Sequence, residues 1–79
     1  MTYNVLYFGM IAEALTKHKE TLHFENTVNV REFREFIKKQ YSKLDNMSFQ
    51  LAINKKITPE ETTIEDNSEI AILPPFAGG

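Results

Sequence analysis

The stretch VREFREFIKKQY, residues 30–41, carries the clearest secondary-structure pattern in the chain. Its apolar side chains recur at positions i, i+3, i+7 and i+11, which lie on one face of an α-helix; they are Val30, Phe33, Ile37 and Tyr41. Positive charge at Lys38 and Lys39 suits the last turns of such a helix, because the helix dipole is negative there. Thr27 or Asn29 can cap the first turn. The stretch therefore predicts the main helix of the fold.

Other segments are rich in β-branched and aromatic residues, which is typical of strands; they are residues 3–8, 20–25, 49–54 and 69–73. Residues 54–56 resemble a tight turn that leads into a further short strand around Ile57. The elements follow in the order strand, helix, strand, helix and then two or three strands. This order indicates an α+β fold with a mixed sheet of four to five strands, one main helix and a short first helix.

The short first helix is expected over residues 10–19, directly after Gly9 ends the first strand. Its candidate inward-facing residues are primarily Met10 and Ala14, then Ile11 and Leu15. Residues 42–48 and 59–68 are polar and predict loops, and Ile64 is the one apolar anchor in the second of them.

Length and composition exclude several classes of protein. The chain has 79 residues, which is enough for one domain. Its net charge of −2 and mixed charge pattern predict no nucleic-acid partner. It has no cysteine, so disulfides, thiolate metal sites and thiol nucleophiles are excluded. No apolar run approaches the roughly 20 residues of a membrane span, and no signal peptide is apparent. We therefore expect a cytoplasmic protein with no membrane partner.

Three groups of polar residues are better explained as solvated surface than as sites. The acidic group lacks the spacing of a calcium loop, and the two histidines have no nucleophile at a recognisable spacing. A lysine pair in a turn is usually solvated. These residues are Glu60, Glu61, Glu65, Asp66 and Glu69; His18 and His23; and Lys55 and Lys56.

Both faces of the first strand are apolar, which leaves two interpretations open. The strand is covered on both faces, or one face is an interaction surface. If the flanking strands are adjacent, Phe8, Ile57 and Leu73 can form one apolar patch on the face away from the main helix. Such a patch is either second-face core or a protein interface.

The last residues, LPPFAGG, follow the final strand and form the least ordinary segment of the chain. Pro74 and Pro75 lack backbone donors, so they favour an extended chain that leaves the sheet. Phe76 offers an apolar anchor. The slim end formed by Ala77, Gly78 and Gly79 lets another protein approach closely. The chain therefore divides into a domain of residues 1–73 and a flexible C-terminal tail of residues 74–79.

These residues resemble a known family. The segments VLYFG, IAEA, LAINKKIT and EIAIL, followed by LPPFAGG, are similar to the small, sulfur-carrying subunits of molybdopterin synthase over essentially the whole chain. The resemblance implies the ubiquitin-like β-grasp fold. Where that family often has Asp-Gly-Asp-Glu before the last strand, this chain has Asp-Asn-Ser-Glu, residues 66–69. Asparagine tolerates the left-handed conformation, so we expect the turn to persist.

The resemblance also implies a function in molybdenum cofactor biosynthesis. A ubiquitin-activating-type adenylating enzyme would use ATP to activate the carboxylate of Gly79, and a sulfur donor would convert it to a thiocarboxylate. The tail would then enter the large subunit of molybdopterin synthase and give its sulfur to cyclic pyranopterin monophosphate. The assembly would be a heterotetramer of two small and two large subunits. The carrier itself would hold no stable cofactor or metal, and the catalytic side chains would belong to the large subunit.

The same resemblance places the partner interface on the apolar face opposite the main helix and on the tail. Carried over position by position, the expected interface residues are Phe8, Ile57, Leu73, Pro74, Pro75, Phe76 and Ala77. Alternative functions are a related β-grasp sulfur carrier for thiamine thiazole synthesis or tRNA thiolation, a ubiquitin-like protein modifier, and a plain interaction module.

Overall fold

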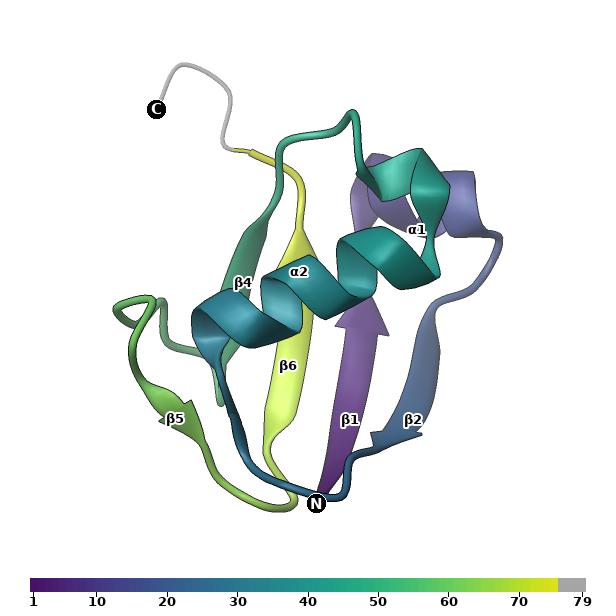
Figure 1. The fold of residues 1–79 in the computed structure, drawn as a ribbon. Coiled ribbons are helices and arrows are strands. Elements are labelled where there is room, and N and C mark those ends of the chain that lie inside the picture. Colours follow the sequence, from purple (N-terminus) through teal and green to yellow (C-terminus); the bar gives the residue numbers. More distant parts are fainter. Residues whose placement is uncertain (76–79) are drawn as a thin grey trace.

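A mixed sheet forms the centre of the molecule, with its strands in the order β2–β1–β6–β4 (Figure 1). Its members are β1 (Thr2–Tyr7), β2 (Lys19–His23), β4 (Gln50–Ile53) and β6 (Glu69–Leu73). The central strands β1 and β6 run parallel, while β2 and β4 are antiparallel to their neighbours. These strand directions confirm the expectation of a mixed sheet. This computed structural model describes residues 1–75.

The main helix, α2 (Val30–Gln40), crosses one face of the sheet (Figure 1). Asn29 is its N-cap, with the Asn29 side chain accepting a bond from the Glu32 amide and the Glu32 carboxylate accepting one from the Asn29 amide, both at 2.8 Å. This reciprocal pair satisfies two donors that the first helical turn leaves free. Of the two cap candidates, Asn29 is therefore the one that acts.

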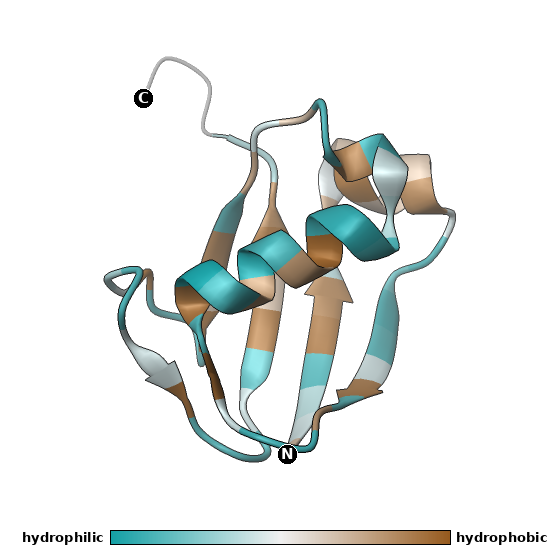
Figure 2. Ribbon diagram, in the orientation of Figure 1, coloured by the Kyte–Doolittle hydropathy of each residue, from teal (hydrophilic) through white to brown (hydrophobic). Residues whose placement is uncertain are grey.

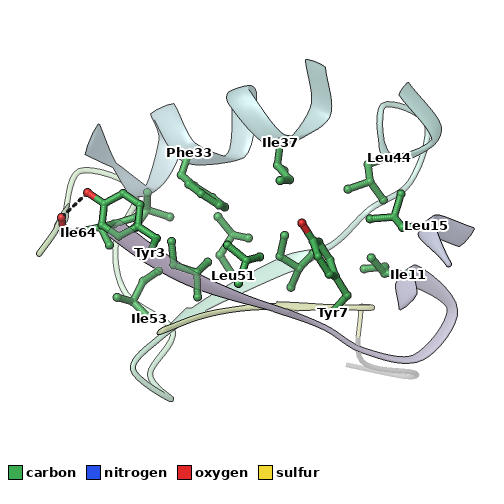
Figure 3. Packing of buried hydrophobic residues seen from close by; sticks show 14 of the residues in the cluster. Tyr3, Tyr7, Ile11, Leu15, Phe33, Ile37, Leu44, Leu51, Ile53 and Ile64 are labelled. Atoms are coloured by element: carbon green, nitrogen blue, oxygen red, sulfur yellow. Dashed lines mark hydrogen bonds between the residues drawn. The ribbon is translucent and has the colours of Figure 1, made fainter. Parts of the chain in front are cut away.

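The hydrophobic core lies between α2 and the sheet (Figure 3). In Figure 2 the central strands are brown where they pass behind α2. Tyr3, Val5 and Tyr7 of β1 point into this core and are at most 2% exposed. The buried Tyr3 hydroxyl donates to the Ile64 carbonyl at 2.8 Å, so its polar end is satisfied. The rings of Tyr3, Phe24, Phe33 and Phe36 pack against one another in tilted and edge-on pairs.

The first helix, α1 (Gly9–Leu15), is shorter than expected and is rotated about its axis relative to the prediction. It ends at Thr16, whose left-handed backbone closes the last turn. The buried residues are Ile11, Ala12 and Leu15. Met10 is 57% exposed and Ala14 is only half-buried, so the choice of Met10 and Ala14 as the primary core contacts was wrong. Ile11 and Leu15 are spaced i, i+4 and present a larger apolar face.

Several short elements lie where the sequence predicted only turns and loops. β3 (Val28–Asn29) pairs with β5 (Thr63–Ile64) in a separate two-stranded sheet. A 3₁₀ turn, η1 (Ser42–Leu44), buries Leu44 completely. The strands β3 and β5 and the turn η1 are too short to produce a periodic pattern in the sequence.

The reverse holds around Ile57, where a short strand was expected. The structure has only a single bridge there, between Ile53 and Lys56.

Two predicted turns depend on asparagine in the left-handed conformation. Asn54 and Lys55 have φ values of 50° and 71°, as a two-residue hairpin of type I′ requires. Asn67 has a φ of 64°, in the turn that precedes β6. The turn at residues 66–68 therefore forms without glycine.

A polar network joins β1, β2 and α2 at one edge of the core. The carboxylate of Glu20 accepts hydrogen bonds from the hydroxyls of Tyr7 and Tyr41. Lys17 donates to the Tyr41 hydroxyl at 2.8 Å and lies 3.5 Å from the Glu20 carboxylate. Partial burial acts to raise the pKa of Glu20, but the bonds from Tyr41 and Tyr7 and the Lys17 charge outweigh it and hold that pKa below its ordinary value. Burial and the Glu20 carboxylate raise the pKa of Tyr7.

We expect Glu20→Gln to lower the free energy of unfolding by about 1 kcal/mol at pH 7, because charged acceptors form the stronger hydrogen bonds. The folded-state pKa of Glu20 lies below its ordinary value of 4.5, so its contribution is fully present above that pH and is lost as the pH falls through the folded-state pKa. Urea unfolding at pH 7 and pH 3 measures the difference, which should shrink at the lower pH. Glu13→Gln, at an exposed position, is the control. A difference that stays constant with pH would contradict this assignment.

Candidate functional site

The tail leaves the molecule from the end of the central strand β6. β1 runs parallel to β6, and Tyr7 is paired with Ile72. The Phe8 amide donates to the Ile72 carbonyl at 3.2 Å, so Phe8 lies beside Leu73. Figure 1 shows this end of β6 at the same edge of the sheet as α1. Pro74 is half-buried and Pro75 is exposed. The predicted tail residues Phe76, Ala77, Gly78 and Gly79 lie outside the described residues.

Two of the three predicted patch residues, Phe8 and Leu73, lie side by side on the face of the sheet opposite α2. Side chains alternate along a strand, and Tyr3, Val5 and Tyr7 point into the core, so Leu6 and Phe8 point to the opposite face. Phe8 is 44% exposed, and Leu73 beside it is half-buried.

Ile57 lies on the same face, beyond the edge strand β4. The bridge between Ile53 and Lys56 fixes the register of the hairpin. Ile53 belongs to the core, so alternation places Ile57 on the opposite face, together with Ala52. Ile57 is 59% exposed, which is the highest value among the exposed large apolar residues of the described part of the chain. Phe8, Leu73 and Ile57 are called the apolar patch below. Neither Phe8 nor Ile57 is second-face core in residues 1–75.

Met10 is an apolar surface residue that the sequence reasoning missed. It lies two residues after Phe8, in the first turn of α1, and is 57% exposed. The sequence contains two i, i+4 apolar pairs, Met10 with Ala14 and Ile11 with Leu15, and their spacing alone does not decide which pair faces the core.

The histidines and acidic residues considered in the sequence form no metal-binding cluster in residues 1–75. Both histidines are exposed, and His23 shares a 3.1 Å hydrogen bond with the Thr2 hydroxyl. Glu60 and Glu61 form ion pairs with Arg34 and Arg31 of α2. No cluster of three potential metal ligands occurs in this part of the chain.

No helix in residues 1–75 is both long enough and apolar enough to cross a bilayer.

Comparison with known proteins gives a consistent result. The pattern of the ThiS family matches residues 5–79. The molybdopterin synthase sulfur carrier subunit of Mycobacterium tuberculosis is 33% identical over 79 residues, which cover 96% of this chain and 95% of the relative. The family pattern includes the tail, and the relative is matched over nearly the full length of both chains.

Solved structures share the fold. A Pyrococcus furiosus chain described as molybdopterin converting factor, subunit 1, superposes with a TM-score of 0.88 at 19% identity, over 96% of this chain and 99% of that one. A second match comes from a complex of subunits 1 and 2 of the molybdopterin-converting factor of Helicobacter pylori, with a TM-score of 0.70 at 21% identity and full coverage of both chains. The expected β-grasp fold is confirmed, and the chain belongs to the ThiS family, which agrees with its resemblance to molybdopterin synthase sulfur carriers.

Proposed function

We propose that this chain is the sulfur carrier subunit of molybdopterin synthase and acts in molybdenum cofactor biosynthesis. The relative from M. tuberculosis, matched over nearly the full length of both chains, supports this assignment. The structural observation that carries it is the position of the tail, which starts from the central strand directly beside the apolar patch. A partner that binds the patch is therefore placed to receive the tail.

The proposed chemistry takes place on the carboxylate of Gly79. A carboxylate at neutral pH is a poor acceptor for nucleophiles because its oxygen is a poor leaving group. Transfer of an adenylyl group from ATP, with release of pyrophosphate, supplies AMP as a good leaving group. Attack by a sulfide-level donor then displaces AMP, which keeps one carboxylate oxygen, and leaves a thiocarboxylate. This step belongs to a ubiquitin-activating-type adenylating enzyme.

The loaded tail then gives its sulfur to cyclic pyranopterin monophosphate, and two such transfers build the dithiolene. The catalytic side chains lie on the large subunit in this proposal. The expected assembly contains two small and two large subunits. In this proposal Gly78 and Gly79, which have no side chains, fit into a confined channel of the large subunit. Phe76 and Ala77 contact the entrance of that channel.

Deleting Gly79 should abolish sulfur transfer and leave the free energy of unfolding unchanged, because the last strand, β6, ends at Leu73. The assay combines the variant with the large subunit, the adenylating enzyme, ATP, a sulfur donor and the precursor. Intact mass should show exchange of one oxygen for sulfur on the parent chain and none on the variant. Glu13→Gln serves as a matched control with full activity. Full activity of the deleted chain, or lysine-linked adducts without any thiocarboxylate, would contradict the proposal.

Replacing Ile57 with Asp should weaken binding to the large subunit more than tenfold, because a charge would then be buried against an apolar partner surface. The free energy of unfolding should change by less than about 0.5 kcal/mol, since Ile57 is largely exposed. Titration calorimetry measures the affinity, and urea unfolding measures the stability. Thr27→Asp, at an exposed loop position before α2, is the control. Equal affinities of the two variants would remove Ile57 from the interface.

A further inference from the structure

The turn between β1 and α1 passes directly against the first residue of the tail. Gly9 has a φ of +56°, a conformation that side-chain-bearing residues rarely adopt. A Cβ placed on Gly9 would lie 3.1 Å from Cγ of Pro74 and 3.7 Å from its Cδ. Gly9 therefore meets two separate requirements, one for the backbone turn and one for the space that Pro74 occupies.

The contact involves a ring that has less freedom to move aside than an ordinary side chain. The proline ring is closed onto its own backbone, which fixes φ near −65°. A flexible side chain would yield to a close neighbour by changing rotamer, whereas displacement of a proline ring moves the main chain with it. A Cβ on Gly9 would approach this ring more closely than ordinary contacts by a few tenths of an ångström, so the ring or the backbone beside it would have to shift.

Pro74 is also the residue at which the backbone ladder ends. The last bond from β1 to β6 runs from the Phe8 amide to the Ile72 carbonyl. On the other side, Leu73 is paired with Gln50 of β4. Proline has no N–H, so Pro74 can donate no further ladder bond. The Pro74 ring lies against Gly9, directly after the last residue of β6.

We propose that Gly9 is a positioning residue for the tail. Its bare Cα forms a seat for the Pro74 ring, and the seat sets the direction in which the chain leaves the sheet. This inference rests on the proposed function, in which the same tail must enter two different proteins. A tail whose base is already fixed loses less conformational entropy when it is threaded into a channel, and the affinity rises accordingly.

The competing explanation is that Gly9 serves only the backbone turn. Asparagine separates the two roles, because it tolerates positive φ better than other side chains but carries a Cβ. Gly9→Asn should weaken affinity for the large subunit about tenfold, which corresponds to roughly 1.4 kcal/mol. The same change in a Pro74→Ala background, where Cγ and Cδ are absent, should weaken it less than about twofold relative to Pro74→Ala alone. Equal effects in the two backgrounds, or no effect of Gly9→Asn on the parent chain, would overturn the proposal.

Pro74→Ala tests the seat without changing the turn, in case Gly9 variants fold poorly. Pro75→Ala is its matched control, because it removes the same backbone stiffness but leaves the Pro74 ring on Gly9. Pro74→Ala should weaken binding several-fold more than Pro75→Ala. Equal losses would show that only proline stiffness matters, and this would also overturn the proposal.

Measurements on the free protein distinguish failure of the seat from failure of the proposed function. Nuclear Overhauser contacts between the Gly9 Hα protons and the Pro74 ring protons should be present in the parent chain. The Cα–Hα residual dipolar couplings of Pro75 should change in Gly9→Asn, but not when Gly9→Asn is added to Pro74→Ala. Both measurements require no partner and no sulfur chemistry. Unchanged couplings in Gly9→Asn, or missing contacts in the parent chain, would refute the seat even if the protein carries sulfur.

Discussion

The parallel pairing of β1 and β6 places the two ends of the sequence side by side at the centre of the sheet, with residue 4 opposite residue 69. The other two strands of the four-stranded sheet pair with these two. β2 is added to one side and β4 to the other, and α2 covers the face on which both central strands are apolar. Because parallel strands end at the same edge, β1 delivers Phe8 and the start of α1 to the edge from which the tail departs.

The two faces of the sheet consequently have different tasks. The face beneath α2 holds the aromatic and aliphatic core, whose burial drives folding. The opposite face keeps Phe8 and Ile57 in contact with water, although a domain of 79 residues has few large apolar side chains to spare. Of these exposed residues, Phe8 lies beside Leu73 at the edge of the sheet where β6 ends.

Strong periodic patterns were sufficient for the main elements. The spacing of Val30, Phe33 and Ile37 was enough to predict where α2 lies and which of its faces is buried. The pattern failed where few residues decide the structure. In α1, a rotation of one residue exchanges Met10 for Ile11, and a helix of two turns holds too few apolar positions to distinguish them. The pair β3–β5 depends on residues far apart in sequence, which local patterns cannot report. The contact of Gly9 with Pro74 is likewise nonlocal and was invisible in the sequence.

The central place of β6 also governs the order of events during synthesis. A nascent chain that ends before Glu69 has already produced β1, α2 and β4, but it lacks the strand to which both β1 and β4 pair. Such a chain cannot close its sheet, and its apolar residues stay exposed to proteases and chaperones. Folding must wait until translation has nearly reached the tail. A chain that terminates before Glu69 therefore releases no folded domain.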